Sequence, residues 1–555
     1  MRDTGQGNRA ARIAPEPAHP DSGRQISDER GGTMAAWDQG YVTDVAYTTN
    51  FYRETTPVWL ATTCLLLGQR PPDLSRPFRY ADLGCGYGVT TLIVAATHPQ
   101  AEVWGFDFNP AHVEWATRVA SAAGLGNAHF VEASFADLAA RAEAALPQFD
   151  FMVAHGVASW ITDDNRRLML DFIRQRLKPG GLVYLSYNVT TGWSGISPLR
   201  QLMWMLAEAN PARSDLAVTG VLDFIGRMRQ AGALFFQANP RVEARLEDMR
   251  RQDPRYIAHE YFNREWRPLM FADMAEAMRE TRCNYVGSAT LSENVDALAV
   301  PEGMLPLLSE AHDQVMHETL RDFASSQSFR RDIYRRGLAP LGAPEQTALL
   351  DELSIASMGI TIPDPITFDT PVGKVTGRPE IYRPLFDLQA EGILSVHRAR
   401  ELPTFASRPL GELLQAIALM IGGGFARPVL RGGVTAAARQ ATQRLNRTIA
   451  LENARGGELA LLAAPLIGSA LPADVLETLI VGDVIAGLPT DLPNLTRSLL
   501  SGLERSGRKV QRDGQPVSDP AEIRTVATDL VERFLNQRLP VLRTLGILDL
   551  APESG

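Results

Sequence analysis

The feature that most constrains this chain is a glycine-rich turn that joins a short apolar strand to a helix. Residues 80–88 read Tyr-Ala-Asp-Leu-Gly-Cys-Gly-Tyr-Gly, and residues 89–97 continue with a helical pattern. Glycine allows the backbone to turn sharply and lets a ligand approach without a Cβ in the way. A second short apolar strand ends in Asp107, where an acid is placed to accept hydrogen bonds from a ribose diol. This order predicts a nucleotide-type ligand at one edge of a parallel sheet.

The spacing of the glycines, and the acid before them, narrow the class of ligand. The dinucleotide motif is G-x-G-x-x-G and places a pyrophosphate at the helix N-terminus. Here the glycines follow G-x-G-x-G, and the preceding acid would repel a pyrophosphate but suits the cation of a sulfonium amino acid. We therefore expect S-adenosyl-L-methionine as the cofactor. The contacts predicted from this motif are Asp82, Gly84, Cys85, Gly86, Gly88 and Asp107.

Strands and helices alternate through the first part of the chain, which is typical of a doubly wound α/β sheet. The expected strands are 79–83, 103–106, 128–131, 149–154 and 182–187, and the expected helices are 89–97, 112–123 and 165–176. Ligands bind at the carboxyl ends of the strands in such sheets. The residues that follow each strand are therefore the candidates for the site, and this domain is expected to span 34–205.

Several side chains follow these strands. We place Phe108 against the adenine face, Ser134 and Phe135 near the adenine edge, and His155 and Gly156 at the methionine end. Trp160, Tyr187, Asn188 and Trp193 follow the fourth and fifth strands and form the candidate acceptor pocket. For each aromatic residue packing is the alternative role, and for His155 a structural hydrogen bond. A tyrosine-rich segment at 41–52, with Tyr47, is either a lid over the cofactor or a helix packed on the sheet.

Length and composition bound the remaining possibilities. A chain of 555 residues exceeds one compact core, and a net charge of −9 argues against a general nucleic-acid binder. Its three cysteines are widely spaced with no C-x-x-C pair, so neither a metal site nor a disulfide framework is expected, and a cytoplasmic location fits. No apolar run is long enough for membrane insertion. Residues 1–33 read as a disordered tail, which leaves either Met1 or Met34 as the start.

The rest of the chain is expected to be mainly α-helical. Residues 206–340 read as a helical domain, with helices near 221–233, 242–252 and 304–325. Proline and glycine punctuate 337–380 and mark a boundary. Residues 341–555 are α-rich, and a β-turn over 369–377 makes a winged-helix-like unit one interpretation.

Several of these motifs resemble a known family. The runs at 155–160 (His-Gly-Val-Ala-Ser-Trp), 177–181 (Leu-Lys-Pro-Gly-Gly) and 184–188 (Tyr-Leu-Ser-Tyr-Asn) are similar to those of class I S-adenosylmethionine-dependent methyltransferases with a methyltransferase regulatory domain. The resemblance extends through 259–263, 285–289, 329–332 and 445–468. It includes rickettsial protein-lysine methyltransferases, and implies a Rossmann-like catalytic domain and a protein substrate, with cell-envelope proteins as a candidate class. Ala158 and the run 189–191 depart from the family pattern at the acceptor mouth.

The resemblance leads to one function and leaves two alternatives. The leading hypothesis is methyl transfer to a lysine, with Trp160, Tyr187 and Trp193 as an apolar wall and Asn188 accepting a hydrogen bond from the amine. The first alternative is transfer to a small molecule or an envelope polysaccharide; a hydroxyl acceptor would need His155 as a general base. The second is a regulator that binds the cofactor without catalysis. Nucleic acid is not an expected partner, and the oligomeric state is left open.

Overall fold

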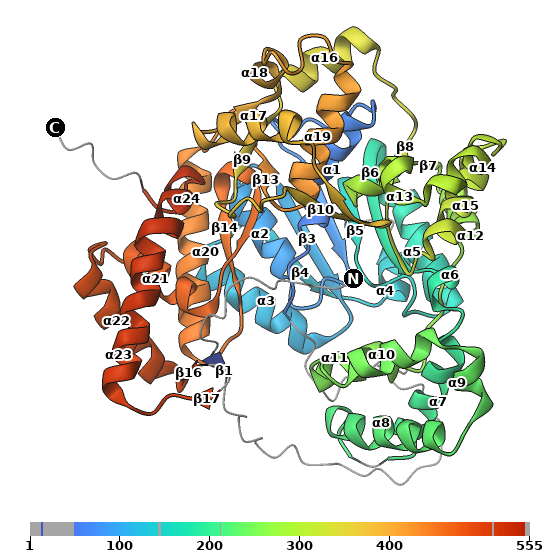
Figure 1. Ribbon diagram of the computed structural model, residues 1–555, viewed down its shortest axis with the longest axis horizontal. Coiled ribbons are helices and arrows are strands. Elements are labelled where there is room, and N and C mark those ends of the chain that lie inside the picture. Colours follow the sequence, from blue (N-terminus) through green and yellow to red (C-terminus); the bar gives the residue numbers. More distant parts are fainter. Residues whose placement is uncertain (1–12, 15–48, 142–145, 211, 513–514, 550–555) are drawn as a thin grey trace.

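A seven-stranded sheet lies at the centre of the molecule, with helical units around it (Figure 1). This computed structural model describes residues 13–14, 49–141, 146–210, 212–512 and 515–549. The sheet has the order β4-β3-β2-β5-β6-β8-β7, in which the first five strands are parallel and β8 is antiparallel to both neighbours. Its strands are β2 (Arg79–Leu83), β3 (Glu102–Asp107), β4 (Ala128–Glu132), β5 (Phe149–Ala154), β6 (Leu177–Asn188), β7 (Cys283–Ser288) and β8 (Phe329–Arg336).

The five strands expected from the sequence are all present. The bounds of β2 and β5 match the prediction, and β6 begins five residues earlier than expected, at Leu177 rather than at Leu182. Strands β7 and β8 lie within residues 206–340, which the sequence analysis expected to be helical. The sheet therefore extends past the predicted boundary at residue 205, and the domain limits themselves stay predictions.

Helix α1 (Pro57–Leu66) precedes β2, and the helices between the parallel strands are α2 (Val89–Thr97), α3 (Pro110–Ala122), α4 (Phe135–Arg141) and α5 (Asp163–Arg176). The side chains of Asn109 and Thr162 accept hydrogen bonds from backbone N–H groups in the first turns of α3 and α5. Thr56 precedes α1, but its hydroxyl donates to the Arg53 carbonyl instead of capping the helix. Pro57 occupies the first turn of α1, where its missing N–H costs no helical hydrogen bond.

A helical unit that we call the cap is inserted between β6 and β7. It contains α6 (Thr190–Trp193), α7 (Ser197–Glu208), α8 (Ser214–Gln230), α9 (Leu234–Ala238), α10 (Arg241–Met249) and α11 (Pro254–Tyr261). Its apolar core includes Met203, Ile225 and Ile257, which are fully buried. Helices α12 (Phe271–Glu280), α13 (Asp296–Ala299), α14 (Leu305–Ser309) and α15 (Gln314–Ser325) follow. The single helix expected over 304–325 is thus two helices separated by a turn.

The C-terminal half lies against one side of the sheet (Figure 1). It consists of α16 (Ala343–Asp351), β9 (Ser354–Ser357), β10 (Thr367–Thr370), β11 (Gly373–Thr376), α17 (Pro379–Ala390), β12 (Leu394–Ser395), α18 (Val396–Arg400), α19 (Leu410–Gly422), β13 (Ala426–Pro428), α20 (Ala436–Ala454), β14 (Leu461–Ala464), β15 (Ser469–Pro472), α21 (Val475–Ile485), α22 (Leu492–Ser506), β16 (Lys509–Arg512), β17 (Gln515–Pro516), α23 (Pro520–Arg533) and α24 (Leu539–Thr544). Helix α20 contacts α2 and α3, and β10 and β11 form the hairpin expected near 369–377. No helix within the described ranges combines the length and apolar character that a membrane span requires.

The proline- and glycine-rich stretch 337–380 is mostly ordered structure, since it contains α16, β9 and the hairpin. Residues 359–365 are the exception, because all seven side chains are exposed and lie outside any helix or strand. Limited proteolysis is therefore expected to cut first, among the described residues, within 359–365. Mass spectrometry of the fragments tests this, and an earlier cut inside α17 or α19 would contradict it.

Candidate functional site

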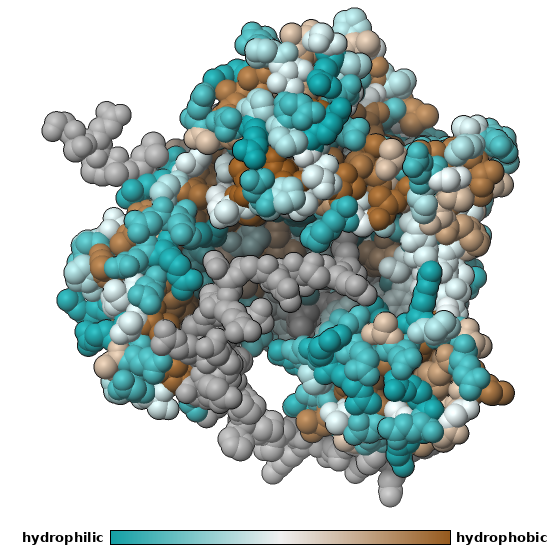
Figure 2. All heavy atoms as spheres, viewed as in Figure 1, coloured by the Kyte–Doolittle hydropathy of each residue, from teal (hydrophilic) through white to brown (hydrophobic). Residues whose placement is uncertain are grey.

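A cleft of about 1730 Å³ opens at the carboxyl ends of the parallel strands. Figure 2 shows the molecule hollowed near the centre of this face. The lining comes from the glycine loop, the turn before α1, the cap, the start of β8 and the β10–β11 hairpin. A pocket for one small ligand usually measures roughly 300–1,000 Å³. The cleft therefore has room for a cofactor and a second reactant together.

The glycine loop presents bare backbone to this cleft. Gly84, Gly86 and Gly88 all have positive φ angles, of 73°, 54° and 64°. A Cβ on Gly86 would meet no atom within 4 Å, whereas one on Gly88 would lie 2.4 Å from the Phe130 ring. Gly84, Cys85 and Gly86 line the cleft, and Gly88 instead packs against β4. The loop thus joins two functions, an open approach for a ligand and close packing of α2 on the sheet.

Asp107 is held in a fixed orientation at the end of β3. Its carboxylate accepts hydrogen bonds from the backbone N–H of Gly86 at 2.8 Å and of Asn109 at 2.9 Å. The Nδ1 atom of His112 lies 3.2 Å from the same carboxylate. Side-chain oxygens held in this way at the strand end suit the two hydroxyls of a ribose. His112 was not among the residues predicted from the sequence, although its place in the first helical turn after Asp107 was a usable signal.

Asp82 is a second carboxyl at the base of the cleft. The Thr91 hydroxyl donates to it at 3.0 Å, and it is 6% exposed. Burial, and then the negative charge of Asp107, raise the pKa of Asp82 to about 7. A cation bound beside this carboxyl would favour its ionised form. The pair of acids fits a ligand with a ribose at one end and a positive charge at the other.

The predicted adenine-side and lid residues reach the cleft where the structure describes them. Phe108, Ser134, Phe135 and Gly156 all line it. The backbone N–H and hydroxyl of Ser134 donate to Asp137 at 2.9 and 2.7 Å, which fixes the start of α4. Tyr47 lies outside the described residues, but Thr49, Asn50 and Tyr52 of the same segment line the cleft.

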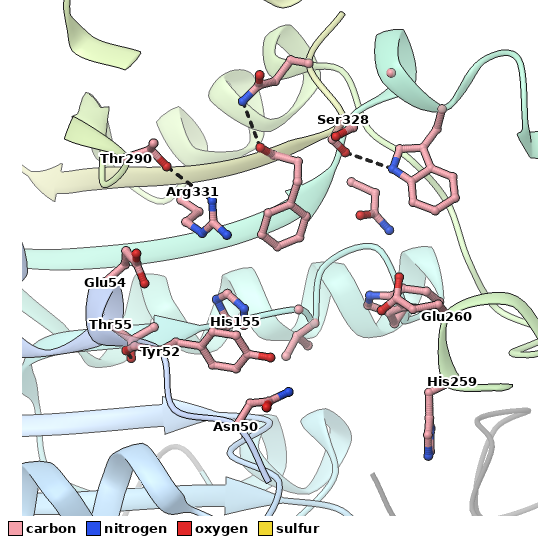
Figure 3. Close-up of a pocket in the computed structure, with 18 of the residues that line it drawn as sticks. Asn50, Tyr52, Glu54, Thr55, His155, His259, Glu260, Thr290, Ser328 and Arg331 are labelled. Carbon is pink, nitrogen blue, oxygen red and sulfur yellow. Dashed lines mark hydrogen bonds between the residues drawn. The ribbon is translucent and has the colours of Figure 1, made fainter. Parts of the chain in front are cut away.

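His155 follows the last residue of β5, and its ring stacks on that of Tyr52 (Figure 3). The two ring centroids are 3.6 Å apart, and Nδ1 lies 2.8 Å from the Tyr184 hydroxyl and 3.2 Å from the Ser186 hydroxyl. Burial, followed by the positive charge of Arg331, lowers the pKa of His155 to about 3. The imidazole is therefore neutral at physiological pH. This environment does not suit the general base that a hydroxyl acceptor would need near pH 7.

Asn188 reaches the cleft, but its neighbour Tyr187 does not. Successive side chains of a strand point to opposite faces, so these two residues of β6 could not both face one site. Asn188 lines the cleft, and its Nδ2 atom is buried without a hydrogen-bond partner among the described residues. Tyr187 is fully buried and donates to Asp332 at 2.5 Å. The prediction that Tyr187 forms an acceptor wall is corrected for this reason.

The Tyr187 hydroxyl belongs to a buried ionic network centred on Arg330. The Arg330 guanidinium contacts Asp332, Asp322 and Glu318 at 2.9, 2.6 and 2.8 Å. Arg331, the next residue of β8, points to the opposite face and lines the cleft. The sequence had placed both arginines in the regulatory region, and alternation along β8 explains their different roles.

Replacing Tyr187 by Phe should lower stability and leave cofactor binding unchanged. Loss of a hydrogen bond to a buried carboxylate costs roughly 1–3 kcal/mol of unfolding free energy. Chemical denaturation measures this, with calorimetric titration of S-adenosylhomocysteine (AdoHcy) as the second readout. Tyr334→Phe is the matched control, since its hydroxyl lies farther from the same Asp332 oxygen, at 3.2 Å, and a smaller loss is expected. Weaker AdoHcy binding without loss of stability in Tyr187→Phe would contradict this assignment and indicate that Tyr187 is part of the binding site.

Trp160 and Trp193 line the cleft as expected, but their ring faces already meet cations of the cap. The Arg200 guanidinium lies 5.8 Å from the Trp160 ring, and that of Arg245 lies 5.5 Å from the Trp193 ring. Such distances are typical of cation–π contacts. Trp160, which follows β5, therefore contacts the cap, whereas the Trp193 contact lies within the cap; both side chains also line the cleft.

Glu260, at the end of α11, is a site candidate that sequence reasoning missed. Figure 3 shows it across the pocket from Tyr52 and His155. Burial raises the pKa of Glu260 to about 7, although the positive charges of Arg245 and Arg200 act to lower it. A carboxyl with this pKa is half ionised near neutral pH and can take up a proton there. Within the described ranges, no group of three or more potential ligand residues is arranged to hold a metal ion.

Comparison with known proteins identifies the family. Family models match a methyltransferase domain at 81–181 and a predicted methyltransferase regulatory domain at 253–336. The uncharacterized protein sll1526 of Synechocystis is 34% identical over 511 residues, which is 92% of this chain and 99% of that protein. The structure of PKMT2 from Rickettsia typhi in complex with AdoHcy aligns with a TM-score of 0.66 at 18% identity, covering 89% of this chain and 99% of that one. The chain is a class I S-adenosylmethionine-dependent methyltransferase with a regulatory domain.

S-adenosyl-L-methionine is accordingly the cofactor of this methyltransferase, and the site fits it. The buried Asp82 carboxyl suits the positive charge at the methionine end, and the open space at Gly86 leaves room for close approach. Trans-aconitate 2-methyltransferase of Methylobacterium radiotolerans is 30% identical over 162 residues, 29% of this chain and 56% of that enzyme. That similarity covers too little of the chain to extend to the cap or the C-terminal half.

Proposed function

We propose that this methyltransferase methylates the side-chain amine of lysine in a protein substrate. The observation that carries the proposal is the Glu260 carboxyl in the cleft, which can take up the proton of an incoming ammonium group. Once deprotonated, an amine attacks with its own lone pair, and His155, whose pKa is lowered to about 3, is too weak a base to serve a hydroxyl acceptor. The cofactor supplies an activated methyl group, and the protein aligns the acceptor with it.

An incoming lysine would arrive as an ammonium ion, because its reference pKa is about 10.4. Glu260 lines the same cleft, and its pKa of about 7 allows its carboxylate to take up that proton. Asn188 lines the same cleft, and its side-chain oxygen can accept a hydrogen bond from the incoming amine. The size of the cleft, and the exposed hairpin and cap at its walls, suit a polypeptide better than a small molecule.

Labelled methyl transfer to cell-envelope fractions, followed by mass spectrometry of the product, tests the proposal. Methyl-lysine in a protein supports it, and a methylated hydroxyl, polysaccharide or small acid contradicts it. A small carboxylate is the second candidate acceptor, because Arg241, Arg245 and Arg331 line the cleft and an ionised carboxylate needs no base. Cell-envelope proteins are the first substrates to test, on the strength of the family resemblance.

Glu260→Gln should change the pH dependence of the reaction. In the wild type, the rate should rise through about pH 7 as the Glu260 carboxyl ionises and becomes able to accept a proton. The variant should lose this step and rise only at higher pH, as the free-amine fraction of lysine grows. Initial rates from pH 5.5 to 9.5 measure both profiles. His155→Gln is the control and should retain the step near pH 7; an unchanged profile in Glu260→Gln would remove the role of this carboxyl.

A further inference from the structure

The turn that carries Tyr52 is attached to the C-terminal half of the chain by Arg53. The Nη2 atom of Arg53 donates to the Gly422 carbonyl at 2.9 Å, and its Nε atom donates to Glu54 at 3.1 Å. Gly422 is the last residue of α19, so this contact joins segments 369 positions apart in the sequence. Arg53 and Gly422 both line the cleft.

Trp59 also contacts both Arg53 and the C-terminal half of the chain. The Arg53 guanidinium lies 4.8 Å from its ring, and that of Arg427, from β13, lies 5.9 Å from the same ring. The indole N–H donates to the Ala289 carbonyl at 2.8 Å, directly after β7. The turn before α1, the end of β7 and the C-terminal half therefore meet at one tryptophan.

Hydrogen bonds within the turn before α1 fix Arg53 and Tyr52 relative to each other. The Thr55 hydroxyl donates to the Tyr52 carbonyl at 2.7 Å, and the Thr56 hydroxyl donates to the Arg53 carbonyl at 2.7 Å. The Tyr80 hydroxyl, on β2, holds the Thr55 carbonyl at 3.3 Å. Tyr52 then stacks on His155 (Figure 3). A continuous set of contacts thus connects Gly422 with His155.

We propose that Arg53 is a positioning residue through which the C-terminal half holds Tyr52 against His155. The stack lies where the strand-end cofactor site meets the cap side of the cleft, so its placement affects both reactants. Displacement reactions depend strongly on such alignment. The role applies to methyl transfer from the cofactor whatever the acceptor is, and does not depend on lysine being the substrate.

The test compares Arg53→Met with Arg118→Met in the full-length protein. Arg118, on α3, forms a two-point ion pair with Glu452 of α20 at 2.8 Å, away from the cleft. This control removes a different contact between the same two parts of the chain. One readout is the NMR signal of the His155 ring in protein labelled at histidine, identified among nine histidines by its loss in His155→Gln. The other is the dissociation rate of AdoHcy, measured by stopped flow.

Arg53→Met should move the His155 signal downfield, because the Tyr52 ring no longer shields it. The dissociation rate of AdoHcy should rise about fivefold, the factor expected for loss of one hydrogen bond. Arg53→Lys, which keeps a donor for Gly422, should restore both readouts in part and covers the case in which the methionine variant fails to fold. Wild-type values in Arg53→Met would overturn the proposal. Equal changes in Arg118→Met would also overturn it, since general loosening of the two parts would then explain them.

Discussion

Asp107→Ala is expected to weaken the binding of AdoHcy by about 100-fold or more. The carboxylate is placed to accept two hydrogen bonds from the ribose, and hydrogen bonds to a charged group contribute roughly 1.5–3 kcal/mol each. The substitution also frees the Gly86 N–H and the His112 ring, which the carboxylate holds at 2.8 and 3.2 Å. Calorimetric titration measures the dissociation constant directly.

Asp171→Ala is the control for this measurement. Asp171 lies on α5 and forms an exposed ion pair with Arg174 at 3.1 Å. Loss of this ion pair should leave the affinity for AdoHcy unchanged, because an exposed ion pair contributes little to stability. An affinity of Asp107→Ala within twofold of the wild type would contradict the placement of the ribose at β3.

Gly86→Val should abolish cofactor binding while the protein remains folded. A Cβ at this position meets no atom within 4 Å, so the added side chain disturbs no packing. It would instead project from bare backbone that lines the cleft, at a φ of 54° that a β-branched residue adopts only with strain. Circular dichroism checks the fold, and titration with AdoHcy checks binding.

Gly232→Val is the control that separates backbone strain from obstruction of the cleft, the two effects expected of Gly86→Val. Gly232 has a φ of 83° and equally open space around its Cβ position, but it lies in the cap outside the cleft lining. It should carry a similar backbone penalty and still bind AdoHcy. Normal binding by folded Gly86→Val would show that the loop is not the cofactor cradle.

The parallel strands could be predicted because their apolar pattern is local. β2 and β5 are buried along nearly their whole length, so their sequences are mainly apolar. β8 reads Phe-Arg-Arg-Asp-Ile-Tyr-Arg-Arg and carries no such signal. The Arg330 guanidinium is buried because Glu318 and Asp322 of α15 pair with it, and that pairing exists only in the folded chain.

The candidate site likewise contains residues that could be predicted from the sequence and residues that could not. The residues after β2, β3 and β5 were predictable from strand ends alone, since the topology fixes where those ends meet. Glu260, Arg331 and Tyr52 come from three separate parts of the chain, and only tertiary structure brings them together. Burial and the charge of Arg331 lower the pKa of His155, so the histidine considered as a base for a hydroxyl acceptor is only weakly basic here.

The order of the strands has a consequence for synthesis of the protein. β7 and β8 close the sheet, but the chain reaches them only after the whole cap has been made, at residues 283 and 329. Until then β6, with twelve residues, is an unpaired edge able to pair with another chain. The segment described as regulatory is thus the last part of the catalytic sheet to be translated. A nascent chain that ends before residue 336 already contains the glycine loop and Asp107, but its sheet still lacks a complete β8.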